Sequence, residues 1–328
     1  MNIIKRVSRR PCCRVLILLA VLFFSFAPSA FAGDFPRVVV FGDSLSDPGN
    51  HFIAFGTTSL QPFAPIPDAS YAIGGHHFSD GATWAELLTQ NLHLPTSGSP
   101  ALRAPGVFTN YAVGRARARA GAPVFPSFDL STQVGLFLSD FGGHAPSDSL
   151  YIVWIGANDL DDALNALASD PVKGATTAGL IIQAAITAVA QNIGVLYTFG
   201  AKSFLIPNLP NLAITPAVRA VGPDAQAAAT LLTAIYDGAL HATLDTLQAT
   251  LPQIHFVRLD VNALFAQLLI VPGAAGLTNV TDSCLTFGVT GDAICATPHR
   301  YLFWDGIHPT TAGHGILAEA ARQALAAP

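Results

Sequence analysis

Short apolar runs alternate with longer segments of helical periodicity through most of this 328-residue chain. The apolar runs predict strands at 38–41, 108–113, 149–155, 203–206 and 254–259. The segments between and after them predict helices at 83–92, 129–141, 160–168, 175–199, 224–250, 261–269 and 310–326. Strand–helix alternation favours a central, mostly parallel sheet of five strands with helices on both faces, a three-layer α/β/α fold.

The N-terminus has the pattern of an export signal. Five Lys and Arg residues precede or begin an apolar stretch at 15–26, and Ala30-Phe31-Ala32 offers a small-x-small cleavage site. We therefore expect residues 1–32 to be a signal peptide cleaved near Ala32, and residues 33–328 to form one domain. The export route, Sec or twin-arginine, is left open. The protein is predicted to be secreted or periplasmic.

The charge of the remaining chain limits its partners. The signal segment contains five of the 16 basic residues and none of the 21 acidic ones, so the rest has a formal charge of −10. An acidic chain is a poor nucleic-acid binder, and we expect no nucleic-acid partner. Arg115, Arg117 and Arg119 form the single basic cluster, which is interpreted as a solvated face.

Two cysteines remain after the signal, Cys284 and Cys295, which are 11 residues apart. An even cysteine count in an exported protein predicts a disulfide between them. Two cysteines without paired histidines do not make a metal site, and none is predicted.

Three of the predicted strands are followed by a polar residue or a glycine. Ser44 follows the first, Gly114 the second and Asn158 the third. In parallel α/β sheets, ligands bind outside the carboxyl ends of the strands, where the strand order reverses. These residues are therefore candidates for one common site.

A serine hydroxyl becomes a strong nucleophile when a base removes its proton. His308 is the best candidate base, and Asp305 lies three residues before it, close enough for one turn of chain to bring its carboxylate to the imidazole. We interpret Ser44 as nucleophile, His308 as general base and then acid, and Asp305 as the group that orients His308. Taken singly, each residue has a plainer interpretation as a cap or turn residue.

Acyl chemistry also needs donors aimed at an oxyanion. The candidates are the backbone N–H groups of Ser44 and Gly114 and the side-chain amide of Asn158. Because Arg115 follows Gly114, either residue is a candidate for the second backbone donor. Arg115 either faces solvent or projects toward a charged group of the substrate.

These residues occur in four ordered blocks, FGDSLSDPGN, NYAVG, IGAND and DGIHPT. The chain thereby resembles the GDSL, or SGNH, hydrolases over its whole length after the signal. The segment FSDGATWAELL at 78–88 is similar to the branch that contains lecithinase-, haemolysin- and acyltransferase-like esterases. The resemblance implies the flavodoxin-like SGNH hydrolase fold and the roles given above for Ser44, Gly114, Asn158, Asp305 and His308. One departure is Arg115, where that branch often has a second glycine.

The resemblance implies a secreted serine esterase or lipase that hydrolyses carboxylic esters without a cofactor. A phospholipase or a glycerophospholipid–sterol acyltransferase is the alternative enzyme, and an inactive surface-binding protein on the same fold is the alternative of another class. The expected partner is a small-molecule or lipid ester, with transient membrane-surface contact allowed. An apolar loop at 52–67 is either an acyl-binding surface or packing against the domain. The sequence leaves the oligomeric state open.

Overall fold

The computed structural model describes residues 35–121 and 127–327, so the predicted signal peptide lies outside the described residues. Its centre is a parallel sheet of four strands in the order β1 (Val38–Gly42), β2 (Leu150–Trp154), β3 (Ser203–Pro207) and β4 (His255–Leu259). These strands are rich in β-branched and aromatic residues, and β1 and β2 are buried along their whole length. The predicted α/β class is confirmed.

The predicted fifth strand at 108–113 is not a regular strand. This segment runs beside β1 and exchanges single backbone bonds with it: the Val40 N–H donates to Thr109 O, and the Tyr111 N–H donates to Val40 O. Only an isolated bridge, Val40 with Asn110, is formed there. The chain therefore moves outward from β1 on one side and then returns to β2 on the other. The strand order reverses at β1, which places a crevice at the carboxyl ends of β1 and β2.

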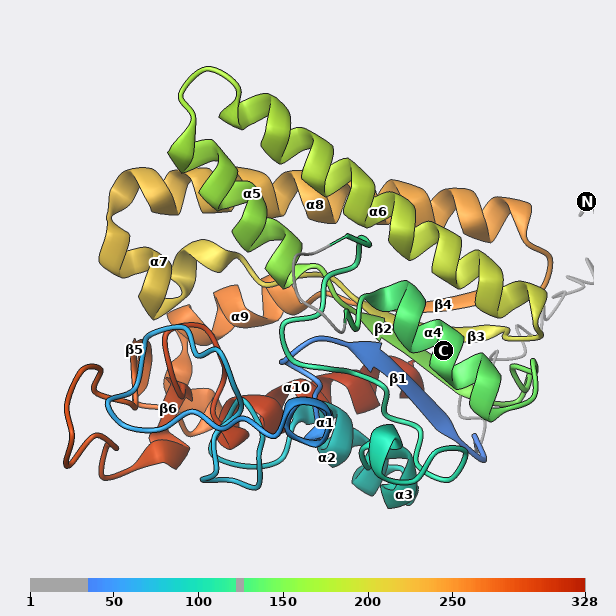
Figure 1. The fold of residues 1–328 in the computed structure, drawn as a ribbon, viewed down its shortest axis with the longest axis horizontal. Helices are drawn as coiled ribbons and strands as arrows, with labels where there is room; N and C mark the ends of the chain where they lie inside the picture. Colours follow the sequence, from blue (N-terminus) through green and yellow to red (C-terminus); the bar gives the residue numbers. More distant parts are fainter. Residues whose placement is uncertain (1–34, 122–126, 328) are drawn as a thin grey trace, which may run out of the picture.

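Helices cover both faces of the sheet. In Figure 1, α4 (Leu130–Asp140), α5 (Ala157–Ser169), α6 (Gly174–Thr198) and α8 (Pro223–Thr250) lie on one side. On the other side lie α2 (Trp84–Asn91), α3 (Pro95–Gly98) and α10 (Thr311–Ala326), and α2 packs on α10. The remaining α-helices are α1 (Asn50–Phe55), α7 (Pro216–Val221) and α9 (Val261–Ile270). Short 3₁₀ turns occur at Ala101–Arg103, Leu212–Ile214, Pro272–Ala275 and Pro298–Arg300.

The seven predicted helices are confirmed to within a few residues, and local capping explains several of their starts. Thr83 and Glu86 form a reciprocal capping box at the start of α2. Asp129, Asp260 and Thr310 each accept a backbone N–H at the start of α4, α9 and α10. Helix α6 is long and apolar enough to cross a membrane, but it packs against α4, α5 and α8.

A second, smaller structure lies beside the main core. Strands β5 (Asn279–Ser283) and β6 (Tyr301–Phe303) pair in parallel, and the segment between them is closed by the Cys284–Cys295 disulfide. The predicted disulfide is confirmed. Six buried side chains form a separate apolar cluster here, the satellite cluster: Phe63, Tyr71, Cys284, Leu285, Ala293 and Trp304. The loop at 56–80 and the disulfide segment thus pack on each other, away from the main sheet (Figure 1).

Candidate active site

The end of β1 presents Ser44 at the crevice. Gly42 is required at this point, because a Cβ atom there would lie 2.7 Å from the carbonyl oxygen of Trp154 on β2. In the turn that follows, the N–H of Leu45 donates to Asp43 Oδ1 at 3.0 Å and the N–H of Ser46 donates to Asp43 O at 3.0 Å. Among the described residues the N–H of Ser44, which precedes these two, has no partner. It is therefore available to a ligand.

Asp305 and His308 follow β6 and meet Ser44 from another direction. The Ser44 Oγ lies 2.9 Å from His308 Nε2, and His308 Nδ1 lies 2.7 Å from Asp305 Oδ2. Asp305 and His308 are both buried, and Ser44 is 9% exposed. Asp305 Oδ1 accepts the backbone N–H groups of Ile307 and His308 at 2.9 and 2.8 Å, which folds residues 305–308 into a tight turn. The structure thus brings the three predicted residues into one hydrogen-bonded series.

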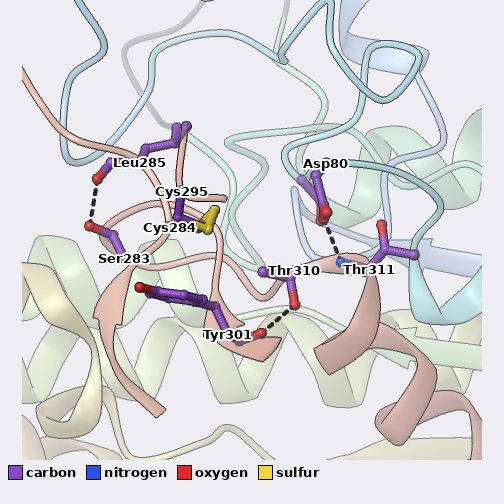
Figure 2. Close-up of a disulfide and its surroundings, with 9 residues drawn as sticks. Asp80, Ser283, Cys284, Leu285, Cys295, Tyr301, Thr310 and Thr311 are labelled. Atoms are coloured by element: carbon purple, nitrogen blue, oxygen red, sulfur yellow. Dashed lines mark hydrogen bonds between the residues drawn. A yellow bond between two sulfur atoms is a disulfide. The ribbon is translucent and has the colours of Figure 1, made fainter. Parts of the chain in front are cut away.

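Side chains of the segment at 78–80 hold the chain in and just after the fourth sequence block, DGIHPT at 305–310. Ser79 Oγ donates to the carbonyl oxygen of Pro309 at 2.8 Å, and Asp80 Oδ1 accepts the N–H of Thr311 at 2.6 Å (Figure 2). The ring of Phe78 lies 5.3 Å from that of His308, between centroids. These contacts position the turn that holds His308.

Asn158 lies in the first turn of α5, after β2. Its Nδ2 donates to the carbonyl oxygen of Ala116 at 2.9 Å, which fixes the amide and leaves its second hydrogen free to face the cavity beside Ser44. Gly156, just before the helix, has φ of 127° and packs on the Tyr236 hydroxyl, which donates to Ile155 O at 2.7 Å. A left-handed glycine and a close tyrosine therefore set the start of α5.

The basic cluster holds the 115–119 segment onto α5. Arg119 pairs with Asp159 at 2.7 Å, and Arg117 and Arg119 both pair with Asp162. The interpretation of this cluster as a solvated face is wrong for Arg117 and Arg119, because their guanidinium groups are partly buried against carboxylates. The same bonds hold the segment that contains Ala116, whose carbonyl oxygen accepts the hydrogen bond from Asn158.

Gly114 has a different partner from the predicted one. Its N–H donates to Asp47 Oδ2 at 2.7 Å, and the carboxylate of Asp47 also accepts the N–H groups of Gly49, Asn50 and His51. The prediction that Gly114 gives this N–H to an oxyanion is not supported here, because a carboxylate already binds it.

Arg115 next to it adopts φ of 67°, a conformation that favours glycine. Its guanidinium pairs with the exposed Asp68 at 2.9 Å. The loop that bears Asp68 therefore reaches the 114–117 turn.

Burial changes the protonation of the acids near Ser44. Desolvation raises the pKa of Asp43 to about 7 and that of Asp47 to about 6, although backbone N–H groups oppose both shifts. Asp43 Oδ2 is buried without a hydrogen-bond partner in the described structure. Desolvation, aided by the charge of Arg115, lowers the pKa of His51 to about 4, so this imidazole stays neutral.

A cavity of about 520 Å³ opens at Ser44, His308 and Asn158. Its walls come mainly from α5, α7 and α8 and are predominantly apolar, with Leu164, Leu212, Ile214, Val218, Val221 and Phe265 among them. From the apolar loop at 52–67, Ile66 reaches this cavity. Phe63 is buried in the satellite cluster, and Phe52 stacks on His76. The loop therefore contributes one side chain to this cavity, and these two aromatic side chains pack elsewhere.

Sequence reasoning missed one residue of the site, Tyr71, whose hydroxyl donates to Asp305 Oδ2 at 2.8 Å. A single tyrosine in a loop 234 residues away has no spacing that would indicate this contact. The arrangement as a whole can deprotonate a serine hydroxyl and bind an oxyanion beside an apolar cavity. Among the described residues, no group of three or more His, Cys, Asp or Glu side chains could hold a metal ion.

Known proteins with similar sequences are found among esterases and lipases and their inactive relatives. A GDSL esterase/lipase of Arabidopsis thaliana is 25% identical over 91% of this chain and 94% of its own length. The thermolabile hemolysin of Vibrio parahaemolyticus is 26% identical over 86% of this chain and 62% of its own. An inactive GDSL esterase/lipase-like protein of Arabidopsis thaliana is 26% identical over 90% of this chain and 72% of its own. The sequence model of the GDSL-like Lipase/Acylhydrolase family matches residues 38–321, and this chain belongs to that family.

Proposed function

We propose that this protein is an exported serine esterase that hydrolyses carboxylic esters with an apolar acyl group. The observation that carries the proposal is the series from Ser44 Oγ through His308 to Asp305, with distances of 2.9 and 2.7 Å, at the mouth of an apolar cavity. Membership in an esterase and lipase family supports ester hydrolysis as the general reaction. Because that family includes inactive members, the site itself has to support activity.

In the proposed mechanism, Ser44 Oγ attacks the ester carbonyl while His308 Nε2 takes its proton. Asp305 holds the imidazole with Nδ1–H toward itself, so that Nε2 can accept. The resulting imidazolium then protonates the leaving alcohol, which departs and leaves an acyl group on Ser44. Water then attacks the acyl carbonyl while His308 takes its proton, and the imidazolium passes that proton to Ser44 Oγ as the bond to the acyl group breaks and the acid leaves.

The negative oxygen formed in both steps needs donors that are already in place. The N–H of Ser44 and the second hydrogen of Asn158 Nδ2 are our candidates, since neither has a protein partner. For a third donor we favour the N–H of Arg115 over that of Gly114, because Gly114 is bound to Asp47 and the N–H of Arg115 has no partner among the described residues.

The cavity supports an acyl group longer than acetyl. Its volume lies within the range of small-molecule sites, and its walls offer few polar partners to a sugar or a peptide. A carbonyl placed at Ser44 would direct an acyl chain between α5 and α8. Similarity to a hemolysin is consistent with a lipid-like ester.

A fluorophosphonate probe and a series of p-nitrophenyl esters from two to sixteen carbons test the proposal. We expect the folded protein to be labelled at Ser44 and to turn over medium or long acyl esters faster than acetate. Ser44→Ala should lower kcat by at least about 10⁴-fold with little change in melting temperature. Folded protein that neither labels nor hydrolyses any ester would contradict the proposal and favour the inactive alternative.

A phospholipid substrate with and without an added sterol separates hydrolysis from acyl transfer. Free fatty acid as the main product supports the proposed hydrolase. Acyl transfer to the sterol would replace it with the acyltransferase alternative.

A further inference from the structure

The carboxylate of Asp305 accepts four hydrogen bonds, and three of them come from its own turn. Oδ1 binds the N–H groups of Ile307 and His308, and Oδ2 binds His308 Nδ1. The fourth donor is the hydroxyl of Tyr71, 2.8 Å from Oδ2. Tyr71 therefore shares one carboxylate oxygen with the imidazole of His308.

Tyr71 is held in place by its backbone and its ring. Its N–H donates to His77 O at 2.8 Å, and its carbonyl oxygen accepts the N–H of His76 at 2.9 Å. The ring meets Phe63 and Trp304 edge to face, with centroids 5.5 and 5.9 Å away, and is 1% exposed. Burial, together with the charge of Asp305, raises the pKa of Tyr71 far above its ordinary value, so the phenol stays a donor.

The disulfide segment closes the same cluster from the other side. The N–H of Cys284 donates to Phe303 O, and the N–H of Leu285 donates to Trp304 O, both at 2.9 Å. These bonds hold the two residues that precede Asp305. Figure 2 shows the disulfide beside this part of the chain, where Thr310 also bonds to the carbonyl oxygen of Tyr301. Tyr71 and Asp305 are thus both buried between these segments.

We propose that Tyr71 is a positioning residue, which fixes Asp305 Oδ2 and limits the charge that this oxygen presents to His308. This inference rests on the proposed ester hydrolysis at Ser44. A buried carboxylate with fewer donors is a stronger base. Without the hydroxyl, Oδ2 would hold the Nδ1 proton more tightly, and His308 would remain an imidazolium to higher pH. An imidazolium cannot accept the proton of Ser44.

Other titratable groups face the pair and are left unchanged by substitution of Tyr71. Asp43, in the turn after β1, and His314, on α10, both interact electrostatically with His308. Burial lowers the pKa of His314 to about 3, so it stays neutral near pH 7. Asp43 has a pKa of about 7, and its titration is common to the wild type and the variants.

Tyr71→Phe tests the proposal against a matched control, Tyr111→Phe. Tyr111 is also a buried tyrosine that donates to a carboxylate at 2.8 Å, but its partner is Asp140, outside the site. Each variant loses one hydroxyl–carboxylate bond, buried for Tyr71 and partly buried for Tyr111, so a general loss of stability should appear in both. The measurement is kcat/KM for a p-nitrophenyl ester from pH 5 to 9, because its pH limbs report the free enzyme's essential acid and base.

We expect the acid limb of Tyr71→Phe to move to higher pH by about half a unit, with activity mostly recovered on the alkaline plateau. The Tyr111→Phe profile should keep the wild-type limb. An unchanged limb in folded Tyr71→Phe, or an equal shift in both variants, would overturn the role of Tyr71.

A second measurement keeps the test valid if Tyr71→Phe does not fold. Incorporation of 3-fluorotyrosine at position 71 keeps the ring and makes the hydroxyl a stronger donor, so the acid limb should move to lower pH. A limb that stays in place would contradict the proposal. Fluorophosphonate labelling distinguishes failure of the proposed function from failure of the role of Tyr71. Wild-type protein that is not labelled at Ser44 would overturn the proposed function. Labelled protein whose variants keep the wild-type acid limb would overturn only the role of Tyr71.

Discussion

Ser44 and Asn158 follow the central strands β1 and β2, whereas Asp305 and His308 follow β6, a strand of three residues at the margin of the molecule. The first pair is positioned by two central strands of a parallel sheet that are buried on both faces. The second is positioned by a disulfide, the satellite cluster and single side-chain bonds from Tyr71, Ser79 and Asp80.

We call Ser44 and Asn158 the rigid half of the site, and Asp305 and His308 the marginal half. The difference between them suggests that the two halves respond to different perturbations. A buried parallel sheet derives its stability from many apolar contacts, so no single bond determines where Ser44 lies. The marginal half has a small core and depends on a few directional contacts. We therefore expect substitutions in the rigid half to change the rate of the chemical step while the site keeps its geometry. Substitutions in the marginal half should instead change the position of Asp305 and His308.

Among changes that leave the nucleophile in place, Asn158→Ala should have the largest effect on turnover, because it removes one proposed oxyanion donor from the rigid half. We expect kcat to fall about 10²- to 10³-fold with little change in KM, since the amide acts on the transition state. The bond from Asn158 to Ala116 is a single one, so the loss of stability should be small. Steady-state kinetics with urea unfolding checks both parts. A raised KM with unchanged kcat would show that Asn158 binds substrate.

The residues of both halves that carry the chemistry could be predicted from sequence. A short apolar run with a glycine and a polar residue after it indicates a strand end, and parallel topology places such ends together. This pattern indicates Ser44 and Asn158. The turn from Asp305 to His308 can be predicted because its two residues are three positions apart.

The contacts that complete the site could not be predicted, because they join segments far apart in the sequence without a periodic pattern. Tyr71 meets Asp305 through loop packing, and Asp47 meets Gly114 through a turn. The segment at 108–113 has a strand-like composition, but it forms only scattered bonds to β1. Side-chain pairing of Arg117 and Arg119 likewise depends on where α5 lies.

Removal of the disulfide should have an intermediate effect and act on the marginal half alone. We expect Cys284→Ala combined with Cys295→Ala to lower the free energy of unfolding by about 3 kcal/mol on the chain-entropy model. Fluorophosphonate labelling of Ser44 should slow, because the segment before Asp305 loses its anchor. Urea unfolding and labelling rates measure these effects, and reduced wild type serves as a comparison. A less stable protein that is labelled at the wild-type rate would show that the disulfide does not position the pair.

Asp43→Asn should have the smallest effect on turnover of the three, because asparagine keeps the acceptor for the N–H of Leu45. Its effect on stability should instead depend on pH. Burial raises the pKa of Asp43 from 3.8 to about 7, so the folded state keeps a proton that the unfolded state has lost between these values. The contribution of this carboxyl to stability is therefore fully present below about pH 4 and is lost as pH rises through about 7. The wild type should lose stability relative to Asp43→Asn across this window, and the two should converge at its acid end.

Urea unfolding of the wild type and Asp43→Asn at several pH values measures this difference in stability. The titration of Asp47 is common to both proteins and cancels in the difference. If the difference in the free energy of unfolding stayed constant with pH, Asp43 would be ionised in the folded protein, as a well-solvated carboxylate is.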